Sequence, residues 1–100
     1  MAATEGLIEI GSIIQRRDGF RGGRPFIAGT GITIDRIAVL TGQGYSPQEI
    51  VDDFRPALSL AQVYAAVAFY LLNKDQIDAE ITAMDEETER VAREHYAAGR

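Results

Sequence analysis

Residues 46–73 of the chain read SPQEIVDDFRPALSLAQVYAAVAFYLLN, and this stretch contains two helix-start signatures. Ser46 with Glu49 and Ser59 with Gln62 each have the spacing of a capping box, in which the serine side chain accepts a backbone N–H and the side chain three positions on accepts one in return. A proline follows the first serine, where its missing N–H removes no helical hydrogen bond. A short helix, a proline-containing turn and a second helix give the outline of a helix-turn-helix.

The second of these helices, residues 59–73, is unlike a helix that reads DNA, because it carries no Lys, Arg, Asp or Glu. Contacts to bases and phosphates come mostly from Arg, Lys, Asn and Gln, so Gln62 near its start is the one side chain suited to that task. We expect the core face of this helix to consist of apolar residues at helical spacing, namely Leu60, Val63, Tyr64, Val67 and Leu71.

A second apolar face on the same helix needs a cover of its own. Few other elements of a 100-residue chain are available for this, so either the C-terminal helix folds over the face or a second subunit packs on it. We expect a homodimer, with burial inside the subunit as the alternative. The residues that we expect at a dimer or partner interface are Ala65, Phe69, Leu72, Ile77, Ile81 and Met84.

The first third of the chain has the composition of a small β element. Its β-branched runs predict short strands that pair as a hairpin or small sheet, at residues 7–10, 13–15, 25–27 and 31–34. The three glycines within residues 18–23 predict a loop between the second and third of these strands.

The rest of the chain predicts helices, which we expect over residues 35–41, 46–53, 59–73 and 74 to about 97. The last helix either continues the third or breaks near Asn73. The predicted fold class is mainly α with a small β element, forming one domain with an appendage. Its parts are a short β element with a loop (residues 1–34), a trihelical helix-turn-helix-like core (35–73) and an acidic C-terminal helical tail (74–100).

The net charge of −5 is unevenly distributed along the chain. Residues 74–100 hold eight acidic and four basic side chains, whereas the preceding residues are nearly balanced. Overall acidity argues against strong non-specific DNA binding but allows a local contact. The predicted DNA-binding set is Gln62 with the basic residues of the predicted loop, Arg16, Arg17, Arg21 and Arg24. The alternative is a solvated loop that keeps an edge strand from aggregating.

The sequence offers little chemistry for catalysis. His95 is its only histidine, and no spacing of His, Cys, Asp or Glu indicates converging metal ligands. Gly22-Gly23 and Gly29-Thr30-Gly31 match neither a P-loop nor a dinucleotide fingerprint, and we expect them to serve backbone positions with positive φ. We therefore expect no enzymatic activity and no cofactor. The absence of cysteine, and of any apolar run of ~20 residues, predicts a cytoplasmic protein without a membrane segment.

A family signature is visible in residues 22–34, GGRPFIAGTGITI, which resemble the DUF433 pattern Gly-Gly-Lys-Pro-Val-Ile-x-Gly-Thr-Arg-Ile-x-Val. The downstream Gly-x-Gly-Tyr-Ser-Pro-Gln-Glu-Ile segment at residues 42–50 continues the resemblance, which spans about residues 13–72. Two positions depart from the pattern. Arg24 replaces the usual Lys and keeps the charge, whereas Gly31 replaces the usual Arg and removes a cation beside the turn.

The resemblance implies a β element followed by a homeodomain-like trihelical core, usually dimeric, and similarity to VapB-like antitoxins. It also implies a PIN-domain-like toxin nuclease as a partner that the chain would inhibit, and binding to its own operator DNA. Two hypotheses follow. In the first, the chain is an antitoxin-like transcriptional regulator whose acidic tail binds a basic partner. In the second, it is a protein–protein interaction or assembly module with a helix-turn-helix fold and no DNA binding.

Overall fold

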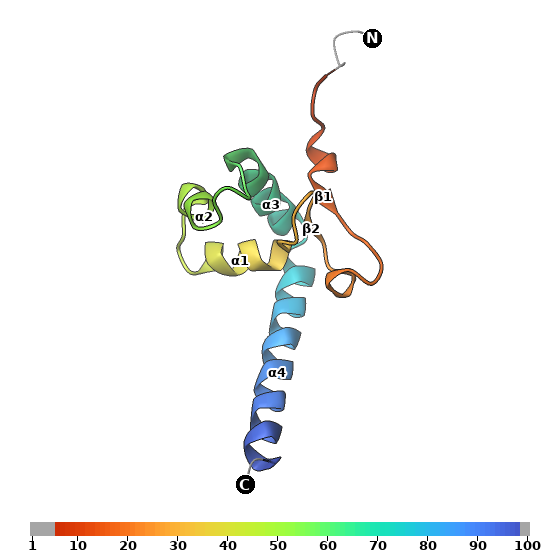
Figure 1. The fold of residues 1–100 in the computed structure, drawn as a ribbon, viewed down its shortest axis with the longest axis vertical. Helices are drawn as coiled ribbons and strands as arrows, with labels where there is room; N and C mark the ends of the chain where they lie inside the picture. Colours follow the sequence, from red (N-terminus) through yellow and green to blue (C-terminus); the bar gives the residue numbers. More distant parts are fainter. Residues whose placement is uncertain (1–5, 99–100) are drawn as a thin grey trace.

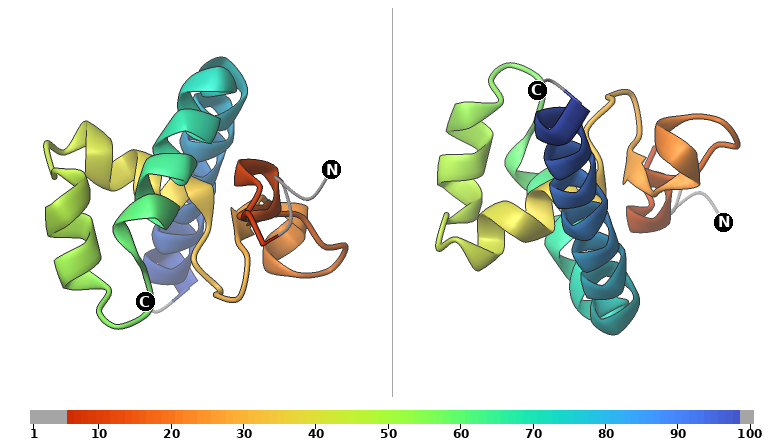
Figure 2. Two further views of the ribbon diagram at one scale, coloured as in Figure 1. Left: turned by 90° about the horizontal axis from the view of Figure 1, so that it is seen from above. Right: turned by 90° about the horizontal axis from the view of Figure 1, so that it is seen from below.

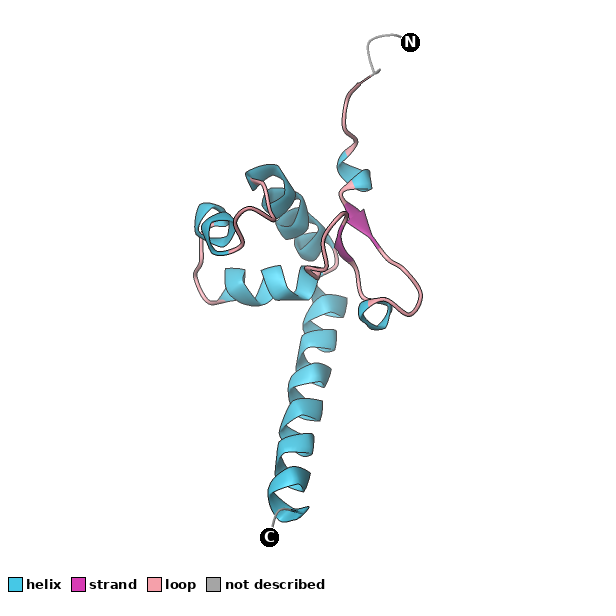
Figure 3. Ribbon diagram, viewed as in Figure 1, coloured by secondary structure: helices cyan, strands magenta, loops and turns pink. Residues whose placement is uncertain are grey.

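The computed structural model describes residues 6–98, in which a two-stranded antiparallel sheet precedes four α-helices (Figure 1). In chain order the elements are β1 (Ile14–Gln15), β2 (Phe26–Ile27), α1 (Ile34–Gly42), α2 (Pro47–Asp53), α3 (Leu60–Leu72) and α4 (Lys74–Ala98). Short 3-10 turns lie at Ile10–Ser12 and Arg21–Gly23. The architecture is therefore mainly α with a small β element, as the sequence predicts (Figure 3).

Both predicted capping boxes are present and set the starts of α2 and α3. The Ser46 hydroxyl accepts the backbone N–H of Glu49 at 3.2 Å, and the Glu49 carboxylate accepts the backbone N–H of Ser46 at 2.9 Å. The same pair of bonds joins Ser59 and Gln62, at 3.2 and 2.7 Å. Each box satisfies N–H groups that the first turn of a helix leaves without a partner. Sequence alone therefore placed these two helix starts correctly.

The β element is smaller than predicted. β1 and β2 pair in antiparallel fashion, with Ile14 opposite Ile27, and an isolated bridge joins Phe26 to Thr33. The strand predicted at residues 7–10 is absent from the described part of the chain. The backbone there enters a 3-10 turn instead, in which both the N–H and the hydroxyl of Ser12 donate to the carbonyl of Glu9. The chain turns at Ile10–Ser12 before it enters β1, so residues 7–10 pair with neither strand.

The core lies where α3 crosses α1 and α2 against β2. Its fully buried side chains are Ile27, Ile34, Ile37, Ile50 and Val63. The two views of Figure 2 place the β element on one side of α3 and α4, and place α1 and α2 on the other. This arrangement brings the loop before β2 close to the start of α1, which matters for the site below.

The predicted core face of α3 is wrong in its orientation. Val63 is buried and Val67 is half-buried, but the other three predicted core residues, Leu60, Tyr64 and Leu71, are 40, 58 and 61% exposed. Ala66, which is fully buried, lies on the inward side instead. Because α3 is apolar on nearly every side, periodicity could not determine which side faces inward.

α3 and α4 are separate helices with a break at Asn73, whose backbone (φ −125°, ψ 31°) leaves the helical region. The Asn73 side-chain amide donates to the carbonyl of Phe69 at 3.0 Å and closes the end of α3. α4 then turns away from the core, and its far half extends into solvent (Figure 1). The principal extents of the molecule, 67 × 29 × 26 Å, reflect this projection.

Candidate functional site

The arginine-rich loop between β1 and β2 is organised by two aromatic rings. Phe20 and Phe26 pack with their ring centroids 4.7 Å apart at an interplanar angle of 59°. The guanidinium of Arg17 lies 5.5 and 5.7 Å from the two ring centroids, and that of Arg21 lies 5.5 Å from the Phe20 ring. Such cation–π contacts hold the side chains in place while leaving their N–H groups free to bind an anion.

The backbone of this loop depends on positive φ angles. Gly22 and Gly23 have φ of 66° and 76°, as predicted, and Arg16 donates from Nε to the carbonyl of Gly23 at 3.0 Å. Arg21 also has a positive φ, 52°, which is uncommon for a residue with a side chain. Non-glycine residues held in this region are enriched at functional sites.

Arg24 has a structural role. Its Nη1 donates to Asp35 at 2.9 Å in a half-buried ion pair and contacts the sulfur of Met84 at 2.9 Å, while its Nε donates to the carbonyl of Arg21 at 2.9 Å. Arg24 thereby joins the loop, α1 and α4. Truncating it would leave the carboxylate of Asp35 buried without a counter-charge, which is costly.

The predicted DNA-binding set divides into two places. Its four arginines stay on the loop between β1 and β2, where Arg21 and Arg24 line a shallow pocket with Arg36 of α1, and Arg16 lines a separate small pocket against α3 and α4. Gln62 lines a different, apolar groove, and its amide oxygen already accepts the backbone N–H of Ser59. Arg36 could not be assigned to the loop from the sequence, because the contact depends on how the turn after β2 folds back.

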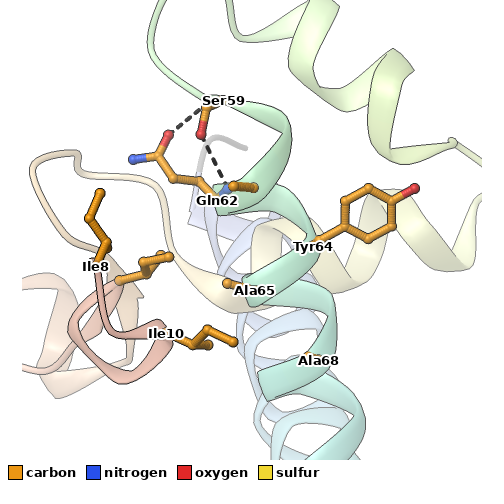
Figure 4. Close-up of a pocket in the computed structure, with 9 residues that line it drawn as sticks. Ile8, Ile10, Ser59, Gln62, Tyr64, Ala65 and Ala68 are labelled. Atoms are coloured by element: carbon orange, nitrogen blue, oxygen red, sulfur yellow. Dashed lines mark hydrogen bonds between the residues drawn. The ribbon is translucent and has the colours of Figure 1, made fainter. Parts of the chain in front are cut away.

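The apolar groove has a volume of about 760 Å³ and lies between the N-terminal segment and α3 (Figure 4). Ile8 and Ile10, which are 81 and 71% exposed, form one wall. Ala65 and Ala68 of α3 form the other, and Tyr64 lines the groove at its margin, with its ring pointing away from the isoleucines in Figure 4. Large exposed apolar side chains that line a common groove indicate an interaction surface. The N-terminal isoleucines were missed in the predicted interface because they were assigned to a strand.

Most of the predicted interface residues are covered inside the subunit. Ala65 and Ile77 are 8 and 3% exposed, and Phe69 and Ile81 pack against the core as half-buried side chains. Met84 is half-buried beside Arg24. Leu72, in contrast, is 84% exposed. The first turns of α4 therefore cover part of the second face of α3, while the side that includes Tyr64 and Leu72 stays open.

A polar cluster fixes the junction of α3 and α4. Tyr70 donates its O–H to Asp78 at 2.7 Å, and Lys74 donates to the other carboxylate oxygen at 2.5 Å. The hydrogen bonds from Lys74 and Tyr70 lower the pKa of Asp78 below its usual value. The hydrogen bond to Asp78 raises the pKa of Tyr70 and also that of Lys74. The cluster joins the end of α3 to the first turns of α4.

Beyond residue 84 every described side chain of α4 is exposed. This half of the helix carries ion pairs of Arg90 with Glu87 and with Glu94, the latter at 2.8 Å. Its remaining acidic residues, Asp85, Glu86 and Glu89, have no basic partner among the described residues. The side chain of His95 lies outside the part of the chain whose side chains the structure describes.

Metal and membrane sites find no support in residues 6–98. No group of three or more His, Cys, Asp or Glu side chains in the described residues is placed to hold a metal ion. Within the same residues, none of the helices combines the length and the apolar character that crossing a bilayer requires.

The fold defines a small, mainly α protein in which a short β element precedes three packed helices. The model of the family described as "Protein of unknown function (DUF433)" matches residues 14–70, from β1 into α3, and the chain belongs to the DUF433 family. The predicted resemblance is thereby confirmed. The crystal structure of a DUF433 member protein from Anabaena variabilis ATCC 29413 is similar, with a TM-score of 0.65 and 31% sequence identity over 71% of this chain and 69% of that chain. A comparison with curated proteins found no match.

Proposed function

We propose that the chain is a non-catalytic, antitoxin-like regulator of the cytoplasm whose α4 docks on a basic partner protein. The observation that carries this proposal is the far half of α4, where residues 85–94 are exposed on every side of the helix. Five of these ten residues are acidic and two are basic. A helix that covers nothing in its own domain, and that presents mainly negative charge, is suited to bind a positively charged surface.

The proposed partner is a basic nuclease of the PIN-like class, as the family resemblance implies. Val91, half exposed on the same helix, would supply an apolar contact among the charges. A helix that binds in a groove uses such anchors for affinity and uses charges for orientation and association rate.

The test is binding to a PIN-like nuclease encoded beside the gene for this chain. Asp85→Asn with Glu86→Gln and Glu89→Gln should weaken the complex at least about tenfold at low salt, because three carboxylates without a basic partner among the described residues are lost. The matched control carries Glu9→Gln, Asp18→Asn and Asp53→Asn, which remove the same charge from exposed positions on the domain. Equal weakening by both triple variants, measured by calorimetry, would contradict a role for α4.

The regulatory part of the proposal is operator binding through the loop arginines. Arg16 and Arg17 are exposed on the loop and retain guanidinium N–H groups for phosphate oxygens. Purified protein should retard DNA from its own upstream region at low salt, and Arg16→Ala with Arg17→Ala should weaken the shift. No retardation at low salt, where phosphate contacts are strongest, would exclude operator binding.

The apolar groove supports a second candidate function, an assembly module without DNA binding. A second copy packed on the groove would cover Tyr64 together with the N-terminal isoleucines. Tyr64→Glu should then halve the sedimentation mass, because an unpaired charge would be buried in the contact. Gln43→Glu serves as the control, since it makes the same change of charge at an exposed site of the domain away from the groove. A monomeric wild-type protein would exclude this function.

A further inference from the structure

A pocket of about 210 Å³ lies over the first turn of α1, outside the groove and away from the far half of α4. Its walls come from four separate places in the chain. The loop before β2 supplies Arg21 and Arg24, the turn after β2 supplies Gly31, and α1 with its cap supplies Thr33 and Arg36. Phe54, which follows α2, closes one side. No acidic side chain is among the residues that line it.

The guanidinium of Arg21 is fitted against Gly31. A Cβ atom at position 31 would lie 2.6 Å from Nη2 of Arg21, closer than real Cβ atoms approach other heavy atoms. The guanidinium of Arg21 can therefore occupy this position only because residue 31 has no side chain. Arg21 also has a positive φ of 52°, so its backbone holds an unfavourable conformation that directs the side chain here.

Arg36 brings a second cation to the same pocket. Its guanidinium lies 5.8 Å from the centroid of the Phe54 ring, a stacked position that leaves the N–H groups available. Within residues 6–98 neither Arg21 nor Arg36 forms an ion pair, whereas Arg24 is paired with Asp35. The pocket thus holds three arginines against one carboxylate, and two of its positive charges are uncompensated.

The start of α1 adds to this positive potential. Thr33 is the N-cap residue and lines the pocket, yet its side chain makes no capping hydrogen bond. The N–H groups in the first turn of a helix have no partner within the helix, and the helix dipole favours an anion at this end. In α2 and α3 a serine hydroxyl accepts one of these N–H groups. In α1 the N–H of Ile34 donates to the carbonyl of Pro25 at 3.0 Å, whereas the N–H groups of Asp35 and Arg36 have no acceptor among the described residues.

We propose that this pocket is an oxyanion site that binds a phosphate group of a nucleic-acid backbone. A tetrahedral phosphate has the charge and the acceptor oxygens that two forked guanidinium groups and a helix start can bind together. The pocket is shallow and open, which suits a phosphodiester in a chain. Arg36, which was not in the predicted DNA-binding set, belongs to it, while Gln62 does not.

The inference rests on the proposed function for the source of the phosphate, so its test has two arms. In the first arm, inorganic phosphate is titrated into isotope-labelled full-length protein, and backbone amide shifts are followed by NMR. In the second arm, a fluorescent duplex from the upstream region is titrated with protein at several salt concentrations, and anisotropy is measured. The first arm detects the site alone, and the second detects the nucleic acid.

Three variants distinguish anion binding at this pocket from a general effect of net charge. Arg21→Asn with Arg36→Gln removes both uncompensated cations, and asparagine tolerates the positive φ at position 21. Arg90→Gln with Arg93→Gln removes the same charge from α4 and is the matched control. Gly31→Ala changes no charge and displaces the guanidinium of Arg21, the far end of a flexible side chain, so the fold should persist.

We expect phosphate to shift the amides of Gly31, Thr33 and Arg36 in the wild type and not in the pocket double variant. DNA affinity should fall about tenfold for each arginine removed, and the salt dependence should decrease by about one unit of slope per arginine. Gly31→Ala should weaken phosphate binding and DNA binding, whereas the α4 control should weaken neither by more than about twofold, because Arg90 and Arg93 do not line the pocket.

If phosphate does not shift these amides in the wild type, the proposed oxyanion site is excluded. Any DNA binding would then belong to other residues. Equal losses in the pocket variant and the α4 control also exclude the site, since net charge alone would account for them. A phosphate response without DNA binding supports the oxyanion site, assigns it to a free phosphate compound, and excludes the operator function.

Discussion

The guanidinium of Arg21 lies against Gly31, and this contact accounts for the glycine that replaces the usual arginine of the family pattern. The pattern usually has an arginine at position 31, so glycine there indicates a lost cation. In the structure the guanidinium of Arg21 occupies the space that a side chain at position 31 would need. A positive group therefore remains beside the turn, although it comes from the preceding loop. Sequence alone could not show this, because the contact depends on the conformation of two turns.

At the core, Ile37 provides a direct test of the packing. It is fully buried, so Ile37→Ala should lower the free energy of unfolding by about 3 kcal/mol, from lost burial and from the cavity left behind. Val39 lies on the same helix and is 37% exposed, so Val39→Ala should cost less than about 1 kcal/mol. Urea unfolding followed by circular dichroism measures both. Similar costs for the two variants would contradict the orientation of α1.

Among the elements, the helices with explicit start signals were the most predictable. α2 and α3 begin where their capping boxes place them, and α1 and α4 fall within a residue or so of the expected bounds. The inward face of α3 was not predictable, because alanine, valine and leucine surround the helix and the sequence contains no polar side to mark the outside. The same reasoning explains why residues 7–10 were assigned to a strand, since β-branched residues indicate a strand only where a partner strand exists.

The junction of α3 and α4 should depend on pH. The pKa of Asp78 is lowered in the folded chain by hydrogen bonds from Lys74 and Tyr70. A lowered pKa means that the ionised form stabilises the fold above the unfolded-state pKa of about 4, and that this contribution is lost as the pH falls through the folded value. Between about pH 5 and pH 2, stability should fall more steeply in the wild type than in Asp78→Asn.

Thermal melts at a series of pH values provide the measurement for Asp78. Asp75→Asn is the control, since Asp75 lies on the same turn of α4 and is exposed. The control should follow the wild-type profile. A profile of Asp78→Asn that runs parallel to the wild type would show that the cluster does not titrate with folding.

For the whole molecule, the far half of α4 should be separable from the fold. None of the side chains in residues 85–94 is buried, so their removal exposes no core surface. Limited trypsin digestion should cut first after Arg90 and Arg93 and leave a product whose melting temperature lies within a few degrees of the intact chain. A large drop in melting temperature would mean that this half of α4 supports the domain.

The projection of α4 from the domain determines how far its tip lies from the core. A helix rises 1.5 Å per residue, so the segment from Asp85 to Ala98 reaches about 20 Å beyond its last half-buried residue. A protein bound near the tip would stand clear of the phosphate pocket, and both ligands could be carried at once. Inserting four residues after Asp85 would move the tip outward by about 6 Å and turn it by about 40°. On the proposed function, the helix would act as a spacer, and its length would matter as well as its charge.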